Sequence, residues 1–322
     1  MTDRNQERRH AFIELSDNEI EALIRPRFGS DALEQTTLLS GGRINSNYAL
    51  SLKVEPFNAV LRLHARGQST CRMERDILRN LEGQIPVAKV LHDGSDTTHP
   101  FLVLSWINGE TLDHTLDQQC RNPAKLGSQV GEVLANIHQI EFPETGFFGH
   151  DLKVEKPFPS GKESFLSFVG PALEARAGKR LGPDRTEHLQ EFSQWAAPLL
   201  DQLPKRACLV HSDFNPPNMM IHHGELAAVL DWEFAHAGTP LTDIANMLRP
   251  RAYQPTGFDD AFIAAYETAA GPLPPHWQSL SRILDLMAQI EMLDAPEERP
   301  SIFKWAIERV DDTIRFVESS FT

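Results

Sequence analysis

The stretch that decides the fold of this chain reads His211-Ser212-Asp213-Phe214-Asn215-Pro216-Pro217-Asn218, and Asp231-Trp232-Glu233 and Asp243 follow it. A short apolar run at 208–210 predicts a strand that leads into this stretch, and 219–221 and 227–230 predict a hairpin around His222-His223-Gly224. This hairpin lets Asp213 and Asp231 approach each other. Asp and Asn are common in turns, but an Asp, an Asn five residues on and a second Asp thirteen beyond it are typical of one kind of site.

That kind of site is one for phosphoryl transfer, which needs an aligned acceptor hydroxyl and hard oxygen ligands for Mg²⁺. Asp213 can accept or orient the hydroxyl proton, while Asn218 and Asp231 offer an amide oxygen and a carboxylate to the metal. Glu233 is either a further metal ligand or a neighbour that holds these groups in place, and both interpretations stay open. His211 and Asp243 complete the candidate catalytic residues, with Asp243 expected to tie down the loop.

The composition indicates an ordinary globular protein. The 322 residues are 41% hydrophobic and 24% charged, which favours two lobes around a large core. The net charge of −14 argues against a nucleic-acid partner. It favours cationic partners weakly, since acidity also keeps proteins soluble.

Three cysteines without metal-binding spacing predict neither disulfides nor zinc. No apolar signal core and no stretch of about 20 apolar residues is found, so we expect a cytoplasmic protein without a membrane partner. As an assembly, we expect a monomer or a homodimer.

Hydrophobic periodicity predicts the elements around the central stretch. Ser16 and Glu19 form a capping box that begins a helix at about 16–28. Five strands are predicted at 36–39, 48–54, 59–64, 87–92 and 101–106, with a helix at 70–81 between the third and the fourth. Further helices are predicted at 123–140, 163–176, 185–203, 258–269, 277–293 and 302–319, and the Pro- and Gly-containing stretch 142–162 is expected to be a loop.

Together these residues resemble the aminoglycoside phosphotransferase and choline kinase-like superfamily, small-molecule relatives of protein kinases. The resemblance extends from about Leu38 to the last predicted helix. It implies an α+β, bilobal, protein-kinase-like fold. Residues 1–107 would be an N-lobe with a five-stranded antiparallel sheet plus a helix, and 108–322 a larger, mostly helical C-lobe with the catalytic loop and acceptor pocket. It also implies that Asp213 is the base, Asn218 and Asp231 are Mg²⁺ ligands, and Asp243 supports the loop.

The same resemblance assigns the nucleotide site. Gly41 and Gly42 belong to the loop that covers the phosphates, and Arg62 and Glu74 occupy the positions of the Lys and Glu pair that orients them. Arg62 departs from the family, because a guanidinium is not interchangeable with an ammonium. Backbone groups of Ser105 and Ile107 are expected to bind the purine. ATP is the expected donor and GTP an alternative, because backbone readout leaves little trace in side chains.

The acceptor is predicted to be a small hydroxylated molecule. The chain has Asp231-Trp232-Glu233 where protein kinases have Asp-Phe-Gly, and it lacks their Ala-Pro-Glu and Gly-x-Gly-x-x-Gly segments. The best-known aminoglycoside 3′-kinases have Gly where Glu233 stands, so an aminoglycoside, choline or ethanolamine, a hydroxy amino acid and a sugar all stay open. A nucleotide-binding pseudokinase that acts as an interaction module is the alternative from another class.

Candidate acceptor-binding side chains lie on the last helices. Tyr266 and Trp277 can stack on a quaternary ammonium, or simply pack in the core. Carboxylates on these helices can meet a substrate amine, or simply be solvated: Asp259, Asp260, Glu267, Asp285, Glu291 and Asp294.

Overall fold

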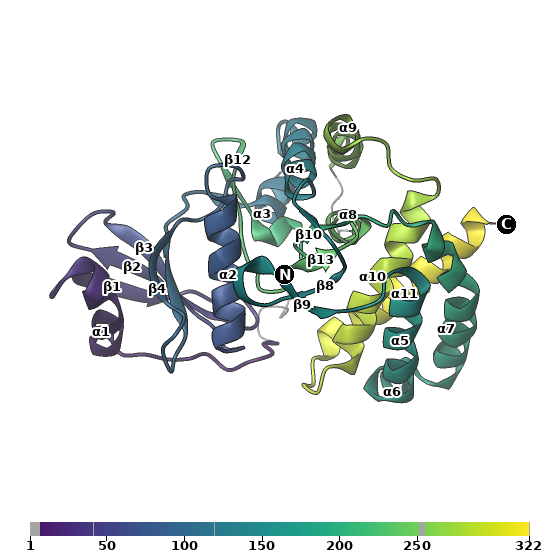
Figure 1. Cartoon of the computed structure of the whole chain (residues 1–322), viewed down its shortest axis with the longest axis horizontal. Helices are drawn as coiled ribbons and strands as arrows, with labels where there is room; N and C mark the ends of the chain where they lie inside the picture. The colour runs from purple at the N-terminus through teal and green to yellow at the C-terminus, as the bar shows by residue number, and fades with distance from the viewer. Residues whose placement is uncertain (1–6, 41, 119, 251–254, 322) are drawn as a thin grey trace.

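The computed structural model describes residues 7–40, 42–118, 120–250 and 255–321. The N-terminal part is a five-stranded antiparallel sheet with the strand order β1-β2-β3-β5-β4. Helices α1 and α2 lie beside this sheet, and most of the other helices lie towards the other end of the molecule (Figure 1). The elements of this part are α1 (Asp17–Phe28), β1 (Leu33–Leu38), β2 (Ser46–Leu52), β3 (Asn58–Leu63), α2 (Gln68–Leu81), β4 (Val90–Gly94) and β5 (Phe101–Ser105). The predicted N-terminal sheet and helix are thereby confirmed.

The two faces of this sheet are covered by different helices, which explains the continuous apolar run of β5. Alternate residues of a strand point to opposite faces. Phe101 and Val103 join Ile20 and Ile24 of α1 in one apolar cluster, whereas Leu102 and Leu104 join Ile77 of α2 and the main core. The predicted capping box of α1 is present, with Ser16 and Glu19 bonded reciprocally.

Two further sheets, of three and five short strands, carry the central stretch. One has the order β12-β11-β6 and the other β7-β10-β13-β8-β9. Strand β10 is buried along its whole length and leads into the stretch, and β11 and β12 form the predicted hairpin. The bounds are β6 (Glu110–Thr111), β7 (Glu141–Phe142), β8 (Gly146–Phe148), β9 (Val154–Pro157), β10 (Ala207–Val210), β11 (Met219–His222), β12 (Glu225–Val229) and β13 (His236–Gly238).

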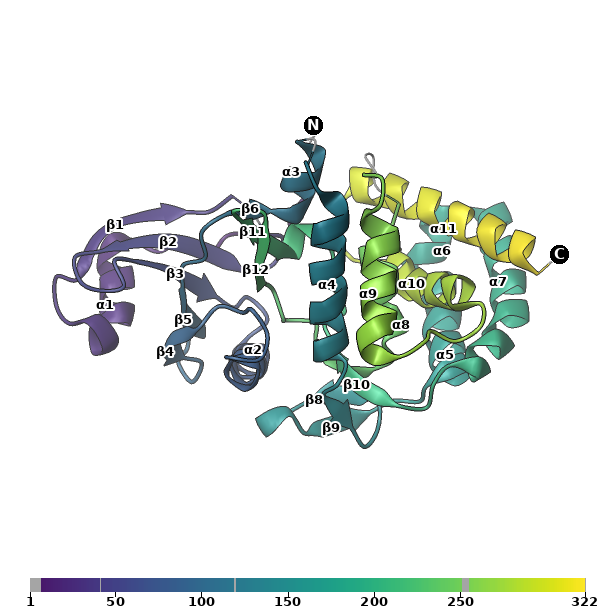
Figure 2. The same cartoon turned by 90° about the horizontal axis from the view of Figure 1, so that it is seen from above.

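The remainder is mostly helical, and its most extensive contact joins α4 and α9, which lie side by side (Figure 2). Gly127 and Gly131 of α4 allow this approach, because an added Cβ would stand 2.3 Å from the carbonyl oxygen of Phe258 and 2.2 Å from that of Phe262. The helices are α3 (Leu112–Asp117), α4 (Pro123–Ile137), α5 (Gly161–Glu174), α6 (Arg176–Leu181), α7 (Pro183–Ala196), α8 (Leu241–Met247), α9 (Phe258–Ala270), α10 (Trp277–Asp294) and α11 (Pro300–Ser320).

Several predicted bounds were wrong for identifiable reasons. The helix expected at 163–176 ends at Glu174, where Ala175 leaves helical geometry and α6 begins. The helix expected at 185–203 is α7 followed by a 3₁₀ turn at Ala197–Gln202, into which Pro198 fits. The expected loop 142–162 contains β8 and β9. Helix α8 was missed, because seven residues are too few for a periodic signal.

Among the described residues, no helix combines the length and the apolar character that crossing a membrane requires.

Candidate active site

Asp213 lies on the loop between β10 and β11, and two amide side chains hold its carboxylate. Asn218 Nδ2 donates to Asp213 Oδ2 and to the Asp213 carbonyl oxygen, both at 2.9 Å. Asn215 Nδ2 donates to the other carboxylate oxygen, Oδ1. Burial raises the pKa of Asp213, and the charge of Asp231 raises it further, while Arg249 acts in the opposite direction. A carboxylate in this state is a stronger proton acceptor than an exposed one.

Asp243 and His211 fix the start of this loop from inside the molecule. The two carboxylate oxygens of Asp243 accept hydrogen bonds from the backbone amides of His211 and Ser212, each at 2.8 Å. Burial opposes the charge of Asp243, but hydrogen bonds from His138 and the loop hold its pKa below the ordinary value. The His211 Nε2 lies 2.8 Å from the Leu230 carbonyl oxygen and therefore carries the ring proton. Both side chains are fully buried.

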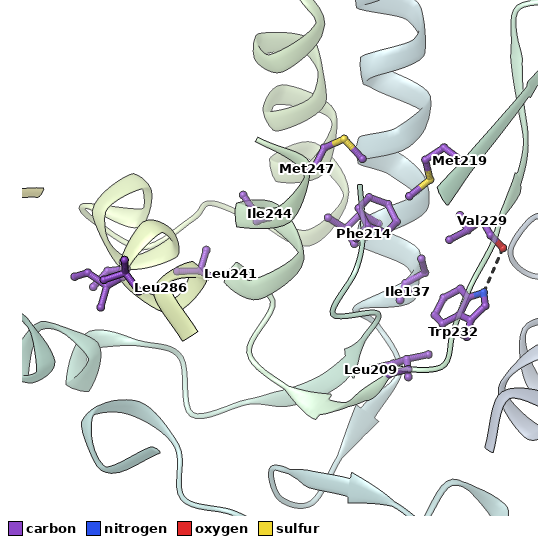
Figure 3. Packing of buried hydrophobic residues seen from close by; sticks show 14 of the residues in the cluster. Ile137, Leu209, Phe214, Met219, Val229, Trp232, Leu241, Ile244, Met247 and Leu286 are labelled. Atoms are coloured by element: carbon purple, nitrogen blue, oxygen red, sulfur yellow. Dashed lines mark hydrogen bonds between the residues drawn. The ribbon is translucent and has the colours of Figure 1, made fainter. Parts of the chain in front are cut away.

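The loops that carry Asp213 and Asp231 are joined through backbone and core contacts. The Leu230 amide donates to the Asn218 carbonyl oxygen at 2.8 Å. Trp232, on the Asp231 loop, is fully buried and donates from Nε1 to the Val229 carbonyl oxygen at 3.2 Å. Phe214, on the Asp213 loop, packs among apolar side chains of the core (Figure 3). Phe214 and Trp232 thus anchor the two loops in the core, while Asp213, Asn218 and Asp231 stay partly exposed.

Arg62 links the sheet, helix α2 and the Asp231 loop. Its Nε lies 3.0 Å from Glu74 Oε2, and its Nη2 lies 2.5 Å from Asp231 Oδ1. Burial works against the Arg62 charge, but Asp231 and Glu74 outweigh it and raise the pKa of Arg62. The expected pair of Arg62 and Glu74 thus forms as an ion pair, and the fork of the guanidinium also reaches Asp231.

Two oxygen donors stand where a cation could bind. Among the described residues, no three His, Cys, Asp or Glu side chains are grouped as a metal cage. Asn218 uses Nδ2 as a donor, which leaves its Oδ1 available, and the Asp231 side chain is 26% exposed. One carboxylate and one amide oxygen fit Mg²⁺, which takes few protein ligands and completes its shell with water and phosphate.

Glu233 lies deeper than Asp231. It is 4% exposed, and its Oε2 has no hydrogen-bond partner among the described residues. Burial and the nearby Asp231 raise the pKa of Glu233 to about 8. Both roles expected for Glu233, a metal ligand and a neighbour that holds the other groups in place, stay predictions.

The predicted nucleotide contacts are only partly described. Gly41 lies outside the described residues, while Gly42 has φ +90° in the turn between β1 and β2. The Ser105 amide donates to the Lys89 carbonyl oxygen at 2.9 Å, so only its carbonyl stays available for a purine. Ile107 follows β5 and makes no backbone hydrogen bond within the described part of the chain.

The candidate acceptor residues mostly serve the fold. Tyr266 is 3% exposed and its hydroxyl lies 2.9 Å from His138 Nδ1, so it does not form an open aromatic surface. Asp294 accepts from the first amides of α6, and Glu291 pairs with Arg9. Asp285 binds Arg249 through both carboxylate oxygens at 3.0 Å.

Sequence reasoning missed Asn215 and Arg249. Asn215 stands within the motif, two residues after Asp213, so its position was a usable signal. Arg249 gave none, because its partner Asp285 is 36 residues away. Ser212 and Asp231 were also missed as strained positions, with φ of +68° and +66°, a feature that gathers at functional sites.

A model of the phosphotransferase enzyme family matches residues 35–282, which include the candidate catalytic, nucleotide-binding and metal-binding residues. The chain belongs to the phosphotransferase enzyme family. This membership confirms the resemblance that the sequence indicated, and with it the expected class of kinase or phosphotransferase that acts on an alcohol group.

Two kinds of known protein are similar to this chain. The mouse protein acyl-CoA dehydrogenase family member 11 is 39% identical over 241 residues, which cover 69% of this chain. The chain spans only 29% of the length of that relative.

Solved aminoglycoside phosphotransferases share the fold at lower identity. APH(4)-Ia superposes with a TM-score of 0.72 at 17% identity, covering 93% of this chain and 99% of that one. A ternary complex of a thermostable mutant of the same protein with ADP and hygromycin B gives 0.70 at 19%, covering 92% and 98%. A putative aminoglycoside phosphotransferase from Ralstonia eutropha gives 0.69 at 17%, covering 95% and 99%. These matches confirm the kinase-like fold.

Proposed function

We propose that this chain transfers the γ-phosphate of ATP to a hydroxyl group of a small molecule, with Asp213 as the base. The observation that carries the proposal is the carboxylate of Asp213, which is held by Asn215 and Asn218 and has a raised pKa. As the acceptor oxygen bonds to phosphorus, its proton passes to Asp213 and ADP leaves. His211 and Asp243 act as positioning residues, because they fix the loop without reaching its surface.

The nucleotide would lie between the β1–β2 turn and the Asp231 loop. Arg62 offers its charge to the phosphates, and Asn218 and Asp231 would hold Mg²⁺. When bound, Mg²⁺ neutralises the charge that develops on the phosphate oxygens. The Ser105 carbonyl and the Ile107 amide would accept from and donate to the purine. Solved relatives of the same fold are complexes with ADP and AMP-PNP, which supports an adenine nucleotide as donor.

The acceptor class has two supported candidates. Solved relatives that bind hygromycin B and gentamicin favour an aminoglycoside or another amino alcohol, as does the acidic charge of the chain. The second candidate is a hydroxylated acyl-CoA. It is favoured because the relative with 39% identity bears the name of an acyl-CoA dehydrogenase, whereas the aminoglycoside kinases are 16–20% identical.

The test is ATP turnover over a panel of aminoglycosides, amino alcohols, hydroxy amino acids, sugars and hydroxyacyl-CoA thioesters. We expect one class to be phosphorylated and Asp213→Ala to lower kcat at least about a hundredfold, as expected for loss of a general base. Turnover that is indifferent to Asp213→Ala would contradict the mechanism. Binding of MgATP without turnover of any acceptor would favour the pseudokinase.

A further inference from the structure

The N-terminal segment before α1 forms hydrogen bonds with the turn that joins β1 and β2. The Arg8 guanidinium donates to three carbonyl oxygens of this turn: Gly42 at 2.5 Å, Ile44 at 3.1 Å and Asn45 at 2.8 Å. The Arg9 amide donates to the Arg43 carbonyl oxygen at 2.8 Å. Four successive carbonyl groups thus point towards the N-terminal segment. We call residues 42–45 the phosphate-covering turn.

The direction of these carbonyls fixes the direction of the amides. In a trans peptide the N–H points opposite to the C=O of the same unit, and the one cis bond recorded for the described residues is Glu55–Pro56. The N–H groups of Ile44 and Asn45 therefore point away from Arg8. Successive N–H groups that point to one side form a concave anion site.

Arg8 is itself held in one orientation. Its Nε donates to the His10 carbonyl oxygen at 2.9 Å, and its guanidinium lies 3.7 Å from the centre of the Phe12 ring. The Ile13 amide donates to Ser46 Oγ at 2.8 Å. A planar guanidinium fixed at three points can hold several carbonyls at once, which a point charge cannot.

The other side of this segment contacts the helical part of the molecule. The Glu7 carboxylate accepts from the Ser301 and Ile302 amides at the start of α11, at 3.2 and 3.4 Å. Arg9 forms an ion pair with Glu291 of α10 at 3.0 Å. A carboxylate at a helix N-terminus is favoured by the free amides and the helix dipole. The segment therefore touches α10, α11 and the turn within three residues.

We propose that Arg8 is a positioning residue for the phosphate-covering turn and that residues 7–13 brace this turn against α10 and α11. The proposal rests on the proposed function, because it assigns the turn to the phosphates of the nucleotide. Arg8 turns the carbonyls away from the nucleotide and leaves the amides facing it. The brace supplies the turn with a fixed conformation before the nucleotide binds, which lowers the ordering cost of binding.

The experiment compares how wild type, Arg8→Ala and Arg8→Lys bind ADP and adenosine in calorimetry with Mg²⁺ present. Arg8→Ala is expected to weaken ADP binding about tenfold, the size of one charge-assisted hydrogen bond. Adenosine has no phosphate, so its affinity should stay unchanged. Arg8→Lys should recover only part of the loss. Arg25→Ala is the matched control, because Arg25 is exposed on α1 and the change removes the same charge.

The outcomes separate the brace from the proposed function. Wild type that binds neither ADP nor ATP contradicts the proposed function and the brace together. Wild type that binds ADP while Arg8→Ala binds it equally well overturns the brace alone. Equal loss of ADP and adenosine affinity also overturns it, because the residue would then only support the fold.

The coupling to α10 is tested with Arg9→Ala, Glu291→Ala and the double variant. If the ion pair transmits the effect, each single change weakens ADP binding about two- to threefold and the double variant is no weaker than the worse single one. Additive losses, or none, would overturn the link to α10.

Discussion

Arg62 and His64 bring two nitrogen-bearing side chains to one buried carboxylate. Arg62 Nε and His64 Nε2 lie 3.0 and 3.4 Å from the same oxygen of Glu74. Arg62 compensates the charge of Glu74, so a second cation there would be in excess. Burial and the Arg62 charge accordingly hold the pKa of His64 well below its ordinary value. Removing the guanidinium would leave Glu74 buried and unpaired, which is the costly way to break such a pair.

This neutral histidine predicts a pH dependence of stability. Below about pH 6.5 the unfolded chain takes up a proton on residue 64 that the folded protein refuses, so the free energy of unfolding falls as pH falls. The slope from this one group approaches about 1.4 kcal/mol per pH unit. Urea unfolding between pH 7.5 and 5.5 should give a shallower slope for His64→Gln than for wild type. His99→Gln, at an exposed position, should keep the wild-type slope, and equal slopes for His64→Gln and wild type would refute the prediction.

Residues within the motif were predictable because the motif fixes their spacing along the chain. Asp213, Asn218 and Asp231 are of this kind. The contact between Arg62 and Glu74 was predictable only through the family resemblance. The contact between Arg62 and Asp231 was not predictable, because it joins residues 169 positions apart. Contacts at such separations depend on how elements pack, which periodicity does not report.

At the scale of elements, the contact between α4 and α9 depends on Gly127 and Gly131, although glycine has a low intrinsic helix propensity. An alanine at position 131 would improve helix propensity by roughly 1 kcal/mol in an exposed helix. Here its Cβ would meet the Phe262 carbonyl oxygen at 2.2 Å, and backbone cannot rotate away. The helices would have to separate.

We therefore expect Gly131→Ala to lower the free energy of unfolding by about 1–3 kcal/mol, the usual effect of overpacking. Chemical denaturation measures this. Glu132→Ala is the control, because Glu132 is exposed on the same helix, and it should stay within about 0.5 kcal/mol of wild type. A stabilised Gly131→Ala would show that α4 and α9 are not this close.

Long amphipathic elements such as α4 and α10 were predictable, whereas breaks between helices were less so. Pro171 lies inside α5 without ending it, and the break comes four residues later at Ala175. The short strands β7 and β8 pair with β10 and β13, which lie far along the chain, and β9 in turn pairs with β8. Local signals do not contain these partners, so the loop predicted there was wrong.

At the scale of the whole molecule, the proposed nucleotide site involves the first sheet, α2 and the central hairpin. A ligand that contacts all of them stabilises the folded state by mass action. At about a hundred times its dissociation constant, MgADP should add about 2.7 kcal/mol, which is a shift of several degrees in Tm.

The proposed metal ligand predicts how that shift depends on Mg²⁺. Differential scanning fluorimetry of wild type should give a larger shift with ADP and Mg²⁺ than with ADP and EDTA. Asp231→Asn should lose the difference, because its carboxylate is the charged ligand. Retention of the full difference in Asp231→Asn would mean that another group holds the metal. Exposed Asp96→Asn serves as the comparison, since its side chain is 75% exposed.

Asp243 connects the loop of Asp213 to helix α9, two regions that a protein engineer would treat as separate. It accepts hydrogen bonds from the loop of Asp213, and His138 connects it to the hydroxyl of Tyr266 on α9. Libraries that diversify α9 to change acceptor preference would therefore disturb the loop of Asp213 whenever they alter position 266. Such libraries should hold this tyrosine constant, and variants selected without that restriction would carry losses of turnover that look like poor substrate fit.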